Sequence, residues 1–175
     1  LGHFALTAQL YSLINKTTGS RIVNVSSGAH NLGNLNFDDL HWESRKYSPW
    51  KAYGDTKIAN LYFTSELSRR LKDAGSDVLV TAAHPGWSST GLQKSILLRF
   101  LNVLFAQSGF MGSLPTLRAA IEPEAKPGDY FGPTGVAEMR GYPELVSTNK
   151  LARNEEIAQK LWSVSEDLTN QPFNL

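Results

Sequence analysis

Two short apolar segments on either side of one long helical stretch constrain the fold of this chain most strongly. Residues 21–26 (RIVNVS) and 78–83 (VLVTAA) are rich in β-branched and small apolar residues, which is typical of strands buried in a sheet. Residues 52–74 lie between them and carry apolar side chains all round a helix, so this helix should be buried on more than one side. The order strand, helix, strand predicts two parallel strands joined by a crossover helix.

Further elements are expected on both sides of this unit. Helical stripes are formed by Leu6, Leu10, Leu13 and Ile14 near the start and by Ile157, Leu161, Val164 and Leu168 within residues 151–168. Helices are also predicted for 89–106 and 115–121, a short strand for 129–131, and a long polar loop for 28–51. We therefore predict an α/β chain forming part of one doubly wound, Rossmann-type parallel sheet.

The composition excludes several classes of function. The net charge of +1 gives no basic field for nucleic acid, and the absence of cysteine rules out disulfides and thiolate metal sites. The histidines show no metal-ligand spacing, so no metal is expected. The most apolar stretch, 96–106, is too short to span a bilayer. We expect a cytoplasmic protein without a transmembrane segment that acts on a small molecule.

Tyr53 and Lys57 are the first candidates for chemistry. They lie four residues apart near the start of the long helix, so their side chains share a face. A phenol titrates at about pH 10 in water, and a nearby ammonium favours its ionised form. The pair can therefore serve as an acid/base. The same spacing also occurs by chance in ordinary surface pairs, so it is weak by itself.

Two further clusters follow the predicted strands. Ser26 and Ser27 end the first strand, and residues 84–90 (HPGWSST) follow the second. Ligands of parallel sheets bind at the carboxyl ends of the strands, so both clusters fall where a ligand is expected. Serines also end strands as ordinary turn residues, and Thr90 can simply cap the next helix. His84 is interpreted as structural.

In combination the three clusters resemble the short-chain dehydrogenase/reductase family. The segments 21–27 (RIVNVSS), 52–60 (AYGDTKIAN) and 84–90 occur in the family's order, and the resemblance covers nearly the whole chain. The opening LGHF, residues 37–40 (FDDL) and residues 161–166 (LWSVSE) resemble the subgroup that is related to retinol dehydrogenases and protochlorophyllide reductases.

The resemblance implies a role for each matched residue. Tyr53 matches the catalytic acid/base, Lys57 the residue that lowers its pKa and holds the nicotinamide ribose, and Ser27, rather than Ser26, the serine that polarises the substrate carbonyl. Asn24 matches a strand asparagine with a structural role. The nicotinamide-binding positions, besides Tyr53 and Lys57, are Pro85, Gly86, Ser88 and Thr90.

The resemblance also implies an NAD(P)-dependent enzyme that interconverts an alcohol and a carbonyl by hydride transfer. The subgroup favours NADP, with NAD as the alternative, and a homodimer is possible in such enzymes. Residues 90–112 carry many apolar side chains and are predicted to form a lid over a lipophilic substrate. Packing on the core accounts for part of this apolar character, and docking on a membrane is a further alternative.

One departure from the family pattern concerns the dinucleotide itself. The chain contains no glycine-rich phosphate loop, and the family's active-site asparagine would fall upstream of Leu1. We therefore interpret residues 1–175 as the C-terminal catalytic part of a single domain whose nucleotide-binding N-terminal half is absent, and expect this segment alone to be inactive. The alternatives are an inactive relative that acts as a binding protein, or an epimerase or dehydratase of the extended branch.

Overall fold

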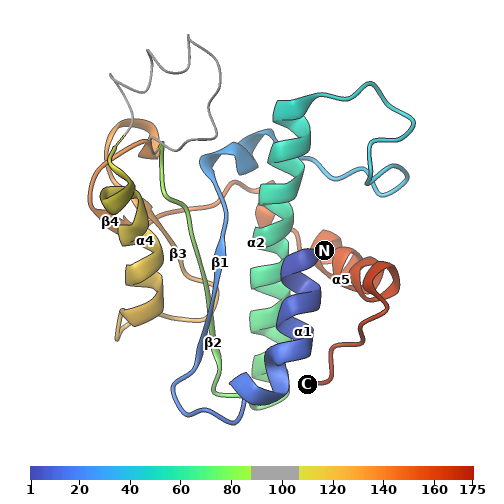
Figure 1. Ribbon diagram of the computed structural model, residues 1–175, viewed down its shortest axis with the longest axis horizontal. Coiled ribbons are helices and arrows are strands. Elements are labelled where there is room, and N and C mark those ends of the chain that lie inside the picture. The colour runs from blue at the N-terminus through green and yellow to red at the C-terminus, as the bar shows by residue number, and fades with distance from the viewer. Residues whose placement is uncertain (88–106) are drawn as a thin grey trace.

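The computed structural model describes residues 1–87 and 107–175 of the chain (Figure 1). The elements, with 3₁₀ helices labelled η, are α1 (Gly2–Ile14), β1 (Arg21–Val25), η1 (Gly28–Leu32), α2 (Pro49–Asp73), β2 (Leu79–Ala83), α4 (Gly109–Ile121), β3 (Tyr130–Pro133), η2 (Val136–Glu138), β4 (Pro143–Leu145), η3 (Leu151–Arg153) and α5 (Glu155–Thr169).

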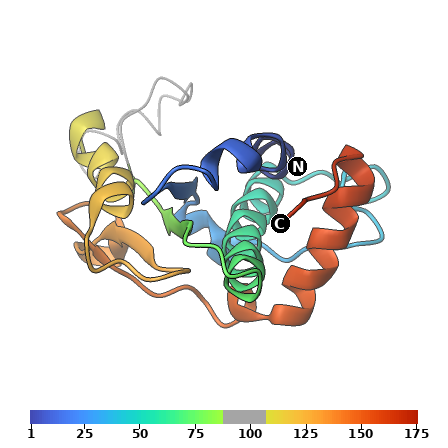
Figure 2. The ribbon, with the colours of Figure 1, turned by 90° about the horizontal axis from the view of Figure 1, so that it is seen from below.

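The strands form one sheet in the order β1-β2-β3-β4, in which β1, β2 and β3 are parallel and β4 is antiparallel. Successive strand residues point to opposite faces. Ile22 and Val80 therefore join the core beneath α2, whereas Val23 and Ala83 pack with residues of α4 and β3. Figure 2 shows α2 and α4 on either side of the strands. The predicted α/β, doubly wound class is confirmed, with the short antiparallel β4 as an unpredicted addition.

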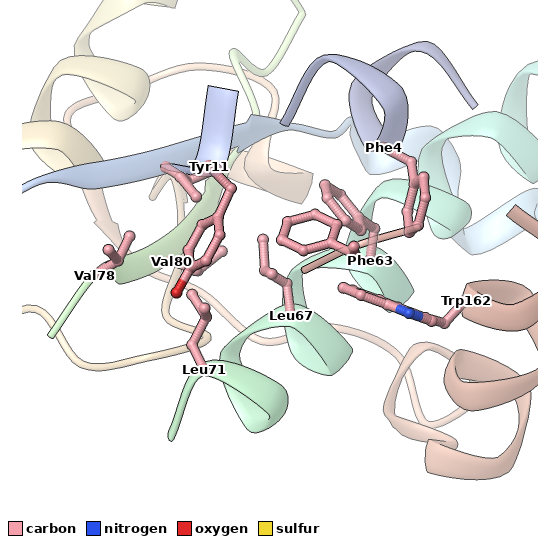
Figure 3. Packing of buried hydrophobic residues seen from close by; sticks show 10 residues of the cluster. Phe4, Tyr11, Phe63, Leu67, Leu71, Val78, Val80 and Trp162 are labelled. Atoms are coloured by element: carbon pink, nitrogen blue, oxygen red, sulfur yellow. The ribbon is translucent and has the colours of Figure 1, made fainter. Parts of the chain in front are cut away.

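An aromatic cluster holds α1, α2 and α5 together (Figure 3). Trp162 of α5 lies with its ring centroid 5.0 Å from Phe4 of α1, in an edge-to-face arrangement. Phe173 follows α5 and lies 4.9 Å from Trp162. The guanidinium of Arg70 lies 4.4 Å from the centroid of the Trp162 ring and forms an ion pair with Glu66. Aromatic burial of this kind makes α5 an integral outer layer over α2.

The apolar stripes predicted for the first and last helices lie beside the most deeply buried faces of these helices and are only partly buried. In α1 the buried residues are Phe4, Thr7 and Tyr11, while the side chains of the predicted stripe at Leu6, Leu10 and Leu13 are 60%, 42% and 63% exposed. In α5 the buried residues are Ala158, Trp162 and Ser165. Of the predicted stripe, Ile157, Leu161 and Val164 are partly buried, the first two against the core, and Leu168 is half-exposed. The aromatic cluster decides the orientation of both helices, because burying its rings removes more apolar surface than burying the leucines.

The predicted loop 28–51 is shorter than expected, because η1 occupies its beginning and α2 begins at Pro49, a residue suited to the first turn of a helix. The remainder is ordered around Arg45. Its guanidinium stacks 3.6 Å from the Trp42 ring centroid and bonds Asp55 of α2 at 3.2 Å. The Asp39 carboxylate accepts hydrogen bonds from the main-chain N–H groups of Glu43, Ser44 and Arg45.

The region after β2 is described only in part. The helix predicted for 89–106 lies outside the described residues, as do the predicted ligand residues Ser88 and Thr90. α4 begins at Gly109, ahead of the predicted start at 115, because the Ser108 hydroxyl caps it by accepting from the N–H of Met111. Among the residues that the structure describes, none of the helices has the length and apolar character needed to cross a membrane.

Candidate active site

Ser26 and Ser27 lie at the carboxyl end of β1 and face different partners. Ser26 is buried, and its hydroxyl donates to the Lys57 carbonyl at 2.8 Å. Ser27 is half-buried and caps η1, where its Oγ accepts from the N–H of Ala29 at 3.2 Å. The cap uses only the acceptor side of the Ser27 hydroxyl, so its O–H can still donate to a ligand. Ser26 therefore has a structural role, whereas the Ser27 hydroxyl can donate a hydrogen bond to a ligand.

Tyr53 and Lys57 share the face of α2 that approaches this strand end. The ammonium of Lys57 lies 5.5 Å from the centroid of the Tyr53 ring and donates to the Val25 carbonyl at 3.3 Å. The Asn60 side chain donates to the same carbonyl at 2.9 Å. Tyr53 is 41% exposed, so its phenol is open to a ligand. Lys57 is thus anchored to the last residue of β1, with Tyr53 beside it on the same face of α2.

Two glycines allow the segment after Ser27 to come this close to α2. A Cβ atom on Gly33 would lie 2.4 Å from the Gly54 carbonyl oxygen, and one on Gly54 would lie 2.8 Å from the Gly33 nitrogen. Neither position can hold a larger residue without moving main-chain atoms. This contact holds η1, capped by Ser27, against the helical turn that carries Tyr53 (Figure 1).

The turn after β2 lies at the same edge of the sheet. Gly86 has a φ of +64°, and a Cβ there would lie 2.5 Å from the Met139 carbonyl oxygen. His84 is buried, with Nδ1 3.3 Å from the Gly86 nitrogen and Nε2 2.9 Å from the Glu138 carboxylate. Burial lowers the pKa of His84 to about 4, so this ring is neutral at physiological pH. His84 therefore has the structural role that the sequence suggested.

The sequence interpretation missed a buried polar cluster behind Ser27. The His30 Nδ1 lies 2.8 Å from the Ser27 carbonyl oxygen, and its ring meets Tyr130 of β3 edge-on at 5.8 Å. The Tyr130 ring in turn lies 5.2 Å from His84. Burial lowers the pKa of His30 and raises the pKa of Tyr130, so both stay uncharged. The only hint in the sequence was the position of His30 three residues after Ser27.

A pocket of about 410 Å³ lies on the other side of Lys57, between α1, α2 and α5. Its lining includes Leu1, Phe4, Trp42 and Trp162 together with Lys57, but not Tyr53, Ser27 or Gly86. The pocket therefore shares Lys57 with the candidate site but lies apart from Tyr53, Ser27 and Gly86. Over the ranges 1–87 and 107–175, no group of three or more histidine or acidic side chains is arranged to hold a metal ion.

Comparison with known proteins tests the family resemblance. Retinol dehydrogenase 13 of Homo sapiens is 37% identical to the chain over 180 residues, which include 96% of this chain and 51% of the relative. Retinol dehydrogenase 11 of Homo sapiens is 38% identical, over 99% of this chain and 53% of the relative. This similarity over nearly the whole chain confirms the resemblance to the short-chain dehydrogenase/reductase family. The chain spans about half the length of the curated relatives that it matches.

Structural similarity points the same way. The crystal structure of an uncharacterized protein from Mycobacterium Paratuberculosis superposes on this chain with a TM-score of 0.80 and 40% sequence identity, over 99% of this chain and 57% of that one. No protein-family profile matches the chain. Of the residues matched to the family motifs, Ser27 follows the carboxyl end of β1, and Pro85 and Gly86 follow that of the neighbouring strand β2. Lys57 bonds the last residue of β1 and lies beside Tyr53.

Proposed function

We propose that the protein of which this chain forms part is an NAD(P)-dependent oxidoreductase that interconverts an alcohol and a carbonyl. The observation that carries the proposal is the anchoring of Lys57 at the end of β1, where its ammonium donates to the Val25 carbonyl and its main-chain carbonyl accepts from the Ser26 hydroxyl. This places the Lys57 ammonium beside the open Tyr53 phenol and next to the strand end that carries Ser27. The names of the similar retinol dehydrogenases describe chemistry of the same class.

Each of the three side chains has a defined task in carbonyl reduction. The Ser27 O–H donates to the substrate oxygen and stabilises the negative charge that grows there. Tyr53 delivers its phenolic proton to that oxygen, as a general acid. Lys57 places a positive charge 5.5 Å from the Tyr53 ring and is itself fixed by the Val25 carbonyl. In oxidation the same proton moves in the opposite direction.

The residues at the carboxyl ends of β1 and β2 fit a nicotinamide dinucleotide. Lys57 and Tyr53 present an ammonium and a hydroxyl that would hold the ribose, and the main chain of Pro85 and Gly86 would contact the nicotinamide. No side chain could extend from the turn at Gly86 without meeting the Met139 carbonyl. When bound, the nicotinamide supplies or accepts the hydride. We propose NADP as the cofactor, with NAD as the alternative, from the resemblance to the subgroup.

Residues 1–175 are proposed to be the C-terminal, catalytic part of a single Rossmann-type domain. Two features support this. β1 is the outermost strand of the described sheet, and α1, which precedes it in the chain, leaves Leu6, Leu10 and Leu13 exposed. An open parallel edge beside an exposed leucine face is a surface that further strands and helices would cover. The phosphate and adenine sites would belong to that part of the domain.

The substrate is proposed to be lipophilic, because of the apolar residues at 90–112 and because the relatives are named for retinol. The full-length protein should reduce butanal, hexanal, decanal and all-trans-retinaldehyde with kcat/KM rising about fourfold for each buried methylene. NADPH or NADH oxidation at 340 nm measures this. Rates that ignore chain length would contradict the lipophilic substrate, and the absence of turnover with every carbonyl and both dinucleotides would contradict the proposed function.

A further inference from the structure

Residues 134–142 pack directly on the turn that follows β2. The N–H of Trp87 donates to the Met139 carbonyl at 2.7 Å. The buried Gln107 side chain donates to the Pro85 carbonyl at 2.8 Å and accepts from the N–H of Gly141 at 3.1 Å. Hydrogen bonds therefore link this segment to Pro85 and Trp87, the residues before and after Gly86, which is proposed to lie against the nicotinamide.

The same segment holds two consecutive residues in an unfavourable conformation. Ala137 and Glu138 have φ values of 52° and 54°, in the left-handed region that residues with a Cβ atom rarely adopt. Such conformations persist where the surroundings fix them, and they concentrate at functional sites. Here the N–H of Glu138 donates to the Gly135 carbonyl at 2.9 Å, and the N–H of Gly135 donates to the Arg140 carbonyl at 2.8 Å. The strained turn directs the Glu138 side chain toward His84.

The hydrogen bonds of His84 define which nitrogen carries its proton. The ring is 1% exposed, and burial lowers its pKa to about 4, so at neutral pH it holds one proton. The Gly86 N–H donates to Nδ1 at 3.3 Å, so the proton is on Nε2, which donates to Glu138 at 2.9 Å. β3 accommodates the ring through Gly132, because a Cβ there would lie 2.0 Å from Nε2.

We propose that Glu138 is a positioning residue for the cofactor: its carboxylate fixes the Nε2–H form of His84, and His84 thereby holds the Gly86 N–H and orients the Pro85–Gly86 turn. This rests on the proposed function, since a nicotinamide cofactor is what gives the turn a ligand. A hydrogen-bonded partner behind a ligand-binding group is a recurring means of fixing its orientation. Glu138 lies between β3 and β4, far from Gly86 in the sequence, so no local sequence motif contains both residues.

The test compares three variants of the full-length protein. Glu138→Ala removes the acceptor, Glu138→Gln retains an amide oxygen that can accept from Nε2–H, and Glu144→Ala removes an exposed carboxylate from the neighbouring strand β4 as a matched control. NADPH affinity is measured by fluorescence titration. Hydrogen–deuterium exchange is followed in peptides that cover residues 85–87, and thermal unfolding shows that each variant is folded.

The expected result is about tenfold weaker NADPH binding and about tenfold faster exchange at 85–87 for Glu138→Ala, close to the lower limit for one hydrogen bond to a charged group. Glu138→Gln should restore both quantities to within about threefold of the wild type, and Glu144→Ala should match the wild type. In turnover, KM for NADPH should rise more than kcat falls. A Gln variant as impaired as the Ala variant would show that the acceptor is not what matters and would overturn the proposal.

Unchanged NADPH binding and exchange in Glu138→Ala would overturn it equally. Failure of the proposed function gives a different pattern, in which the wild-type protein binds neither NADPH nor NADH. In that case the exchange rates at 85–87 still report whether Glu138 and His84 hold the Gly86 N–H, so the structural link and the cofactor role are judged separately.

Discussion

Replacing Tyr53 with phenylalanine is expected to lower kcat for carbonyl reduction by about 10²- to 10⁴-fold, the usual contribution of a general acid. The substitution removes only the phenolic oxygen, and leaves the ring beside Lys57 and the Lys57 bond to Val25 in place. The dissociation constant of NADPH should rise by no more than about tenfold, because the substitution costs at most the one hydrogen bond that the Tyr53 hydroxyl would make to the ribose. Steady-state kinetics with a saturating aldehyde and a fluorescence titration with NADPH measure the two quantities.

Tyr47→Phe is the matched control for this experiment. Tyr47 lies shortly before α2 and is 62% exposed, with its ring against Trp42 rather than at the sheet edge. The control should keep wild-type kcat. A Tyr53→Phe variant that turns over at the wild-type rate would remove Tyr53 from the chemistry, and a variant that loses kcat and NADPH binding together would point to a disturbed site instead of a lost proton donor.

Replacing Trp162 with alanine should lower the free energy of unfolding by about 3–5 kcal/mol, the range for deleting a large buried aromatic side chain. The ring is 2% exposed and joins α5 to the core through contacts with Phe4 and Phe63 (Figure 3). It also contacts Phe173, which follows α5. Its loss leaves a cavity among aromatic neighbours that are fixed by three separate elements. Urea unfolding of the full-length protein, followed by circular dichroism, measures the change.

Trp50→Ala provides the comparison, since Trp50 is 58% exposed at the start of α2 and should change the free energy of unfolding by no more than about 0.5 kcal/mol. Trp162→Phe should retain part of the packing and fall between the wild type and Trp162→Ala. A loss below about 1 kcal/mol in Trp162→Ala would mean that α5 is not held by the aromatic cluster.

The sheet and its long crossover helix could be predicted because their sequence patterns are local. Residues 21–26 and 78–83 carry apolar side chains on both faces, which favours buried parallel strands, and the helix between them has apolar residues all round. The pairing of β1 with β2 along their whole length confirms this interpretation.

The orientation of α1 could not be read in the same way. Its leucines outnumber its buried aromatics, so the pattern favoured Leu6, Leu10 and Leu13 as the inner face, whereas Phe4 and Tyr11 turn inward to meet Phe63, Trp162 and Phe173. The buried face of a helix depends on its partners, and those partners lie far along the chain.

In the candidate site, too, some residues could be predicted from the sequence and others could not. Tyr53, Lys57 and Ser27 stood out because each sits within a short motif, and their assignment to catalysis stays a prediction until tested. Glu138 and Tyr130 come from segments distant in sequence and meet His84 and His30 only in the folded chain. Ser88 and Thr90 lie outside the described residues, and the cytoplasmic location and the homodimer also stay predictions.

The transfer of deuterium tests the central claim most directly. The full-length protein is incubated with decanal and NADPH carrying deuterium at both C4 positions, and the alcohol is analysed by mass spectrometry. A site built from Ser27, Tyr53 and Lys57 predicts one deuterium on the carbinol carbon with the wild-type protein and almost none with Tyr53→Phe over the same time. Alcohol without deuterium, or equal transfer by the Tyr53→Phe variant, would contradict the account.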